Sequence, residues 1–186
     1  MGASLRGWAA RFAATGAGVV AALAHPRPSL LPGLLGYAVL LWLLDDAQAP
    51  RRLQSAFFRG WLTGVGYFLV SIWWVAEAFL VDAKDQAWMA PFAVFFLAAG
   101  MALYWGLAGL IYRLLAPVGP LRLLVFAGAF AGCEWLRGHL FTGFPWDLPG
   151  ETWRAGTAPS QAASVVGAYG LTWITLAVAS APGLGL

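Results

Sequence analysis

Charged residues are scarce in this 186-residue chain, since Asp, Glu, Lys and Arg together make up 10% of it. Soluble globular domains carry about 25% charged residues, and disordered chains are also rich in charge. Hydrophobic residues make up 61% of the sequence, and the mean hydropathy is +0.73. A core of this size could not hide that much apolar surface from water. The composition therefore argues against a soluble or disordered chain and is typical of a polytopic membrane protein.

Residues that bind metals or act as nucleophiles are also few. A single cysteine, Cys133, excludes an internal disulfide and a cysteine-cluster metal site. His25 and His139 have no acidic or cysteine cluster around them. Cys133 stands beside Glu134 in an apolar run, where helix neighbours point about 100° apart and a buried thiol is inert. We therefore expect no metal, no cofactor and no catalytic residue in this chain.

Long apolar runs fill most of the sequence. A membrane-spanning helix needs about 20 mostly apolar residues, and the charged residues divide the chain into pieces of about that length. The predicted spans cover residues 8–24, 29–44, 60–81, 88–112, 123–136 and 161–182. The longest connection is a loop over 137–160, rich in Gly, Pro and aromatic residues. We expect an all-α membrane protein, a polytopic bundle of about six transmembrane helices without a soluble domain.

The basic residues indicate how this bundle is oriented. With the N-terminus inside, seven of the eleven basic residues lie on the inner side and four on the outer side. Positive charge favours the cytoplasmic side, so we predict a cytoplasmic N-terminus and an outward-facing loop 137–160. The seven are Arg6, Arg11, Arg51, Arg52, Arg59, Arg113 and Arg122. Such an excess reports topology rather than nucleic-acid binding. A cleavable signal peptide ending near Ala24 is a rival interpretation of the first run, but the following His25-Pro26 and second apolar run favour a retained hairpin.

Glycines four residues apart recur within the predicted spans, at Gly60 and Gly64 and again at Gly128 and Gly132. Small residues at this spacing let helix backbones approach closely in a membrane, where dispersion replaces the hydrophobic drive. We interpret both pairs as helix-packing positions.

Three ionisable residues lie near the ends of predicted spans. Glu134 and Arg137 are three residues apart and so share a helix face. A lone acid in a spanning helix costs about 2.5–3.5 kcal/mol on insertion scales, and pairing with Arg137 near the outer interface would lower that cost. The pair is either a salt bridge that positions the following loop or part of a substrate site. Glu77 lacks a local partner, so it either reaches water or meets a lipid headgroup amine.

The segment Phe144-Pro145-Trp146 follows this pair closely. Gly143 and Pro145 interrupt regular helix, so the chain must turn here. Phe144 and Trp146 are rings that favour the membrane interface. Irregular backbone at that depth needs cover from protein or a wet cavity. The segment is therefore either the mouth of a site or an interfacial anchor.

Three stretches carry a family resemblance. Glu134–Trp146, with its Glu-x-x-Arg-Gly and Thr-Gly-Phe-Pro-Trp runs, resembles apolipoprotein N-acyltransferases. Ile72-Trp-Trp-Val75 and Val166–Leu171 also look like that family. The resemblance implies a bacterial inner-membrane, multi-pass protein. Its partners would be a phospholipid acyl donor and a diacylated apolipoprotein, whose N-terminal Cys amine receives the acyl chain.

The resemblance also implies a catalytic Cys, Glu and Lys on a nitrilase-like outer domain, reacting through a thioester. We find no such domain before Leu186, and Cys133, Glu134 and Lys84 do not match those positions. We therefore expect a fragment or truncated product, the membrane portion of such an enzyme, that binds lipid without transferring acyl groups. A non-catalytic scaffold that docks a separate enzyme is the alternative. A small transporter fits less well, because the acids lie near span ends rather than at mid-bilayer.

Overall fold

A computed structural model describes residues 7–47, 50–115 and 118–185. Within these residues, all regular structure is helical and none is β-strand, as the composition predicts. In chain order the elements are α1 (Gly7–Ala22), η1 (Leu31–Leu34), α2 (Leu35–Asp45), α3 (Arg52–Ser71), η2 (Trp73–Leu80), α4 (Ala83–Gln86), η3 (Ala87–Met89), α5 (Ala90–Leu115), α6 (Leu121–His139), η4 (Pro149–Thr152), α7 (Ala158–Gln161), α8 (Ala163–Ser180) and η5 (Ala181–Leu184), where η denotes a 3-10 helix. Arg6, which entered the charge count, lies outside the described residues.

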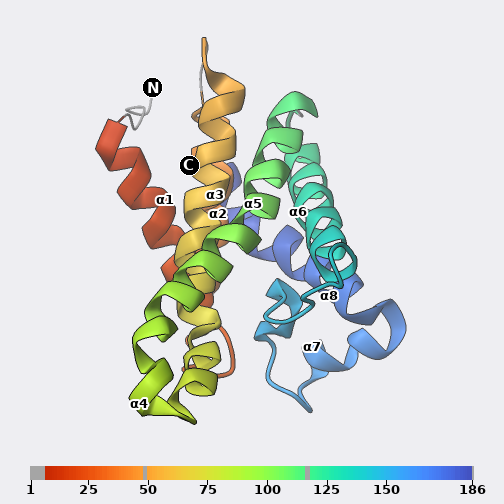
Figure 1. Ribbon diagram of the computed structural model, residues 1–186. Helices are drawn as coiled ribbons and strands as arrows, with labels where there is room; N and C mark the ends of the chain where they lie inside the picture. Colours follow the sequence, from red (N-terminus) through yellow and green to blue (C-terminus); the bar gives the residue numbers. More distant parts are fainter. Residues whose placement is uncertain (1–6, 48–49, 116–117, 186) are drawn as a thin grey trace.

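The long helices run up and down through one bundle (Figure 1). Helix α3 packs between α1 and α5, α5 packs against α6, α6 against α8, and α8 returns to α2. The α3–α5 connection and the segment between α6 and α8 lie at the lower end of the bundle in Figure 1. The start of α3, the end of α5 and the start of α6 lie at the opposite end.

Length and apolar composition identify the candidate membrane spans. Among the described residues, two helices, Ala83–Leu115 and Ala163–Leu184, are long and apolar enough to cross a membrane, or three if α3 and η2 form one bent span. The apolar helix Leu31–Asp45 is shorter. The six-span count and the cytoplasmic N-terminus therefore stay predictions.

Two predicted boundaries around α3 differ in the structure. The span expected over 60–81 is bent by 48° between α3 and η2. The polar segment expected up to Arg59 is helical from Arg52, and Arg59 is buried. Its guanidinium donates to the Leu43 carbonyl and to Asp46 Oδ2, the latter at 3.0 Å. Helix can extend through this arginine because α2 and the residue that follows it, Asp46, supply its partners.

The ends of α6 and α8 also differ from the prediction. Helix α6 continues to His139, three residues beyond the expected end at 136, so Arg137 lies inside the helix rather than in the loop. Helix α8 covers Ala163–Ser180, within the expected 161–182, and is broken near its start at Gly167, where φ is +71°. Only glycine adopts such backbone without strain, so this residue permits the kink.

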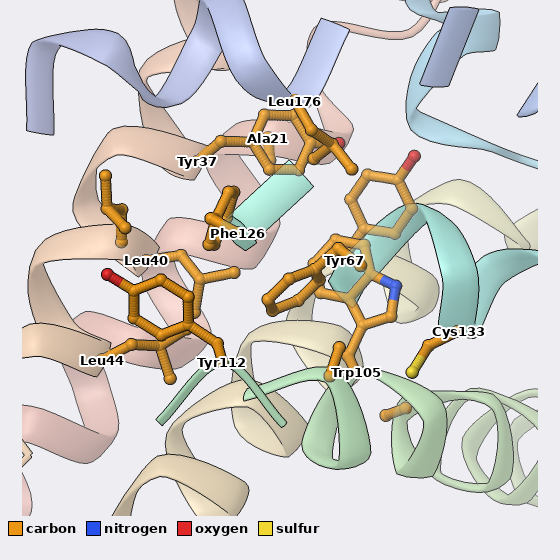
Figure 2. Packing of buried hydrophobic residues seen from close by; sticks show 14 of the residues in the cluster. Ala21, Tyr37, Leu40, Leu44, Tyr67, Trp105, Tyr112, Phe126, Cys133 and Leu176 are labelled. Atoms are coloured by element: carbon orange, nitrogen blue, oxygen red, sulfur yellow. The ribbon is translucent and has the colours of Figure 1, made fainter. Parts of the chain in front are cut away.

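Aromatic side chains fill the centre of the bundle (Figure 2). Tyr37, Tyr67, Trp105, Phe126 and Phe130 are fully buried. Ring centroids lie 4.8 Å apart for Tyr67 and Trp105 and 4.6 Å apart for Phe126 and Phe130, within the range of favourable ring packing. These rings come from α2, α3, α5 and α6, so they join four helices at one level.

The first glycine pair packs helices and the second does not. A Cβ on Gly60 would lie 2.4 Å from the Trp105 carbonyl oxygen, and one on Gly64 would lie 2.9 Å from Ala102 Cβ. Helices α3 and α5 are therefore in backbone contact, as the spacing predicts. On α6, a Cβ on Gly132 meets nothing within 4 Å, and one on Gly128 meets only Trp173 Nε1 at 3.9 Å. The packing role predicted for Gly128 and Gly132 is wrong, because that face is open.

Substitution of these glycines tests the contact. Gly60→Ala should destabilise the bundle by about 1–3 kcal/mol, because the methyl group has to push two helix backbones apart. Gly132→Ala is the matched control, and it should leave stability unchanged or slightly raised, since alanine favours helix. Thermal unfolding in detergent micelles measures both. Equal melting temperatures for the two variants would contradict the close approach of α3 and α5.

Candidate functional site

A buried ion pair lies near the end of α6. Arg137 Nε donates to Glu134 Oε2 at 2.8 Å, and Arg137 Nη2 donates to the same oxygen. The indole N–H of Trp105 on α5 donates to Glu134 Oε1. Glu134 is 0% and Arg137 2% exposed. The pair predicted from the i, i+3 spacing is present, but it lies inside the bundle and not at its surface.

The same guanidinium holds the segment that follows α6. Arg137 Nη1 donates to the Phe144 carbonyl, and Nη2 donates to the Trp146 carbonyl at 3.0 Å. The Phe144 amide donates back to the Arg137 carbonyl at 3.0 Å. Pro145 lies between these carbonyls and is exposed. Because arginine presents several donors in one rigid plane, a single side chain joins the ion pair to the Phe-Pro-Trp turn.

Helix α3 and η2 provide a second attachment for this segment. The Tyr67 hydroxyl donates to the Asp147 carbonyl at 3.0 Å, and Trp74 Nε1 donates to Asp147 Oδ2 at 3.4 Å. The rings of Trp74 and Trp146 meet edge to face, with centroids 6.3 Å apart. Burial raises the pKa of the Asp147 carboxyl, an effect that the Trp74 hydrogen bond opposes.

Helix α8 provides the third attachment. The Gly150 amide donates to Thr172 Oγ1 at 3.1 Å, and Trp153 Nε1 donates to Thr175 Oγ1 at 2.8 Å. Within the segment, Glu151 Oε2 accepts a hydrogen bond from the Leu148 amide at 2.9 Å, while burial raises the pKa of this carboxyl. Residues 144–153 are therefore fixed to α3, α6 and α8, although they form no long helix.

An apolar groove lies beside this segment. Its volume is about 670 Å³, and its walls are α5 and the chain after α6. The lining residues are Phe96, Leu97, Gly100, Met101, Leu103, Tyr104, Leu107, Arg137, Leu140, Phe141, Thr142, Gly143 and Phe144. Arg137 is the one charged residue in this set. The groove suits an apolar chain rather than a polar metabolite.

The predicted site residues separate into two groups. The first group lies around the Arg137 guanidinium and consists of Glu134, Arg137, Phe144, Pro145 and Trp146. Glu77 lies on η2 and is exposed. In the described part of the chain, no hydrogen bond or ion pair links it to the other five. Cys133 is buried on α6, and no metal-binding group of three His, Cys, Asp or Glu residues is found among the described residues.

Several residues of this network were not predicted from the sequence. The unpredicted residues each form a hydrogen bond with the loop or with the ion pair. They are Trp105, Tyr67, Trp74, Thr172 and Thr175. Trp105 is 29 residues from Glu134 and Tyr67 is 80 from Asp147. No local spacing indicates such partners. The only signal in the sequence is the indole or hydroxyl group within an apolar run, which needs a hydrogen bond when it is buried.

Comparison with known proteins identifies the family. The sequence profile of the apolipoprotein N-acyltransferase N-terminal domain matches residues 17–181. The chain is 65% identical over 177 residues to the apolipoprotein N-acyltransferase of Caulobacter vibrioides, covering 95% of this chain and 33% of that protein. The corresponding enzyme of Brucella melitensis is 40% identical over 187 residues, covering 97% of this chain and 35% of that protein. The enzyme of Rhizobium etli is 39% identical over 178 residues.

These matches confirm the resemblance carried by Glu134–Trp146. The chain spans about a third of the length of the curated relatives it matches. It therefore belongs to the apolipoprotein N-acyltransferase family, and it corresponds to the N-terminal domain of that family.

Proposed function

We propose that this chain is the membrane portion of an enzyme that moves an acyl chain from a phospholipid to the N-terminal amine of a diacylated lipoprotein Cys. In that reaction the ester C–O bond of the phospholipid breaks and an amide C–N bond forms. The amine loses a proton, and the alkoxide that leaves the phospholipid gains one. We place the bundle in a bacterial inner membrane as about six spans, with the N-terminus cytoplasmic and residues 140–160 on the outer side.

The groove between α5 and the chain after α6 carries this proposal. We infer that it holds an acyl chain of the phospholipid donor. Its lining is almost wholly apolar, and its volume of about 670 Å³ lies within the usual range for ligand cavities. Phe141, which lines the groove and is 92% exposed, and Trp146, which is 58% exposed, are rings suited to the membrane interface.

Within this proposal, Glu134 and Arg137 are positioning residues. The donors of Arg137 are directed to Glu134 and to two loop carbonyls, so its role is to hold Phe144 as one wall of the groove. Cys133 lies in the packed core and does not line the groove. We place the nucleophile, base and oxyanion stabiliser in the part of the relatives that this chain does not match.

A photoreactive phospholipid tests the groove. The chain, reconstituted in nanodiscs with a phosphatidylethanolamine that carries a diazirine in its acyl chain, should cross-link between Phe96 and Leu107 and near Phe144. Gly100→Trp should lower this labelling at least five-fold. A Cβ there meets nothing within 4 Å, so the indole fills the groove without a backbone clash.

Gly132→Trp is the matched control, because this glycine is equally open but lies on α6 outside the groove. It should label like the parent chain. Equal labelling of the Gly100→Trp variant and the parent, with both folded by melting temperature, would remove the groove as the acyl site. The family assignment would be unaffected, since it rests on sequence.

A further inference from the structure

A second cavity lies between α1 and α3, near the N-terminal ends of both helices. The two helices are in backbone contact in their middle: a Cβ on Gly18 would lie 1.9 Å from the Thr63 carbonyl oxygen, and one on Gly66 would lie 2.2 Å from the Thr15 carbonyl oxygen. Towards their N-terminal ends the helices diverge, and Figure 1 shows α1 leaning away from α3. A cavity of about 710 Å³ opens between them.

The lining of this cavity combines cations with aromatic rings. It consists of Gly7, Trp8, Ala10, Arg11, Phe12, Thr15, Arg51, Gln54, Ser55, Phe58, Arg59, Trp61 and Leu62. Three arginines therefore line one cavity, while none of these lining residues is acidic. Arg59 is already bound to Asp46 and to the Leu43 carbonyl, so one carboxylate balances one of the three cations. The site keeps a net charge of about +2.

Exposure places the two other arginines where a ligand can reach them. Arg11 and Arg51 are both exposed, and the Arg11 guanidinium lies over the Trp8 ring, 4.6 Å from its centroid. Thr15, Gln54 and Ser55 add neutral hydrogen-bonding groups to the lining. Around this polar centre, Trp8 is 70%, Phe12 73% and Phe58 48% exposed. Exposed rings beside cations are typical of the headgroup level of a bilayer.

We propose that this cavity binds the anionic headgroup of a phospholipid in the leaflet on the side where α1 and α3 begin. Arg11 and Arg51 bind the phosphate, Gln54 and Ser55 bind the polar part of the headgroup, and Phe12 and Phe58 contact the acyl chains. Basic pockets between membrane helices bind anionic lipids in this way, and guanidinium–phosphate hydrogen bonds are charge-assisted. The site is separate from the acyl groove, with which it shares no lining residue.

Selective retention of an anionic lipid over a neutral one tests this site. The chain in neutral detergent, incubated with equimolar phosphatidylglycerol and phosphatidylcholine, should retain phosphatidylglycerol preferentially in native mass spectrometry. The double variant Arg11→Gln and Arg51→Gln should bind phosphatidylglycerol at least about ten-fold more weakly, because it removes both exposed guanidinium groups and their charge-assisted hydrogen bonds to the phosphate. A double variant with lysine at both positions should recover part of the binding, because the charge is kept.

The matched control removes two exposed arginines from loops at the opposite end, Arg27→Gln and Arg154→Gln. It should bind phosphatidylglycerol like the parent chain. An equal loss in this control would show a general charge effect and overturn the site. Full competition by millimolar inorganic phosphate would assign the cavity to a soluble anion instead. Equal retention of the two lipids by a folded parent chain would also overturn the proposal.

Discussion

Glu134→Leu is expected to lower the free energy of unfolding by about 3–5 kcal/mol, because it leaves the buried Arg137 guanidinium without its counter-charge. The substitution also removes the acceptor of the Trp105 indole N–H, which is buried. An unsatisfied buried donor adds a cost of about 1–3 kcal/mol where no other partner is reached. Titration with a denaturing detergent, followed by near-UV circular dichroism, measures the change.

A double substitution separates the ion pair from its effect on the loop. Glu134→Leu combined with Arg137→Met should recover most of the lost stability, because a buried pair replaced by apolar groups is often neutral. The loop should still lose its attachment to the α6 guanidinium, since the carbonyls of Phe144 and Trp146 accept from Arg137. Amide hydrogen exchange over residues 140–153 should therefore be faster in the double variant than in the parent chain.

Glu77→Leu is the control for this series. Glu77 is exposed on η2, so its removal should change stability by less than about 0.5 kcal/mol. If Glu134→Leu were no more destabilising than Glu77→Leu, the buried position of the ion pair would be wrong.

Gly143→Ala is expected to detach the turn that follows α6. Gly143 has a φ of +78°, and a Cβ there would lie 2.1 Å from the Gly138 carbonyl oxygen. The left-handed backbone alone costs a non-glycine residue about 1–2 kcal/mol, and the contact with backbone cannot be relieved by a side-chain rotation. The segment from Leu140 to Phe144, one wall of the groove, has to move. Labelling by the photoreactive phospholipid should fall at least five-fold.

Gly156→Ala is the control that separates the effect of the steric clash at Gly143 from the effect of a positive φ. Gly156 also has a positive φ, +84°, and lies in the same connection, but a Cβ there meets nothing within 4 Å. It should therefore show only the conformational cost and label like the parent chain. Similar labelling of the two variants would mean that the Gly138–Gly143 contact does not shape the groove.

Part of this site follows from local spacing. Glu134 and Arg137 are three residues apart in an apolar run, and a buried acid needs a partner, so the ion pair could be predicted. Gly143 and Pro145 indicate a turn in the same way. The spacing of glycines four residues apart predicts close helix packing correctly at Gly60 and Gly64 and wrongly at Gly128 and Gly132. This spacing indicates which positions allow a second helix to pack closely, but it does not indicate whether a second helix lies there.

The sequence by itself determined that the chain is helical and apolar, where its main helices lie, and which family it belongs to. Only the tertiary structure decided the partners of its buried polar groups. Trp105 meets Glu134, Arg59 meets α2, and the threonines of α8 meet the loop. Each of these hydrogen bonds joins segments distant in sequence. A buried polar group must be satisfied, but the sequence shows only that it needs a partner, and helix packing selects which one it meets.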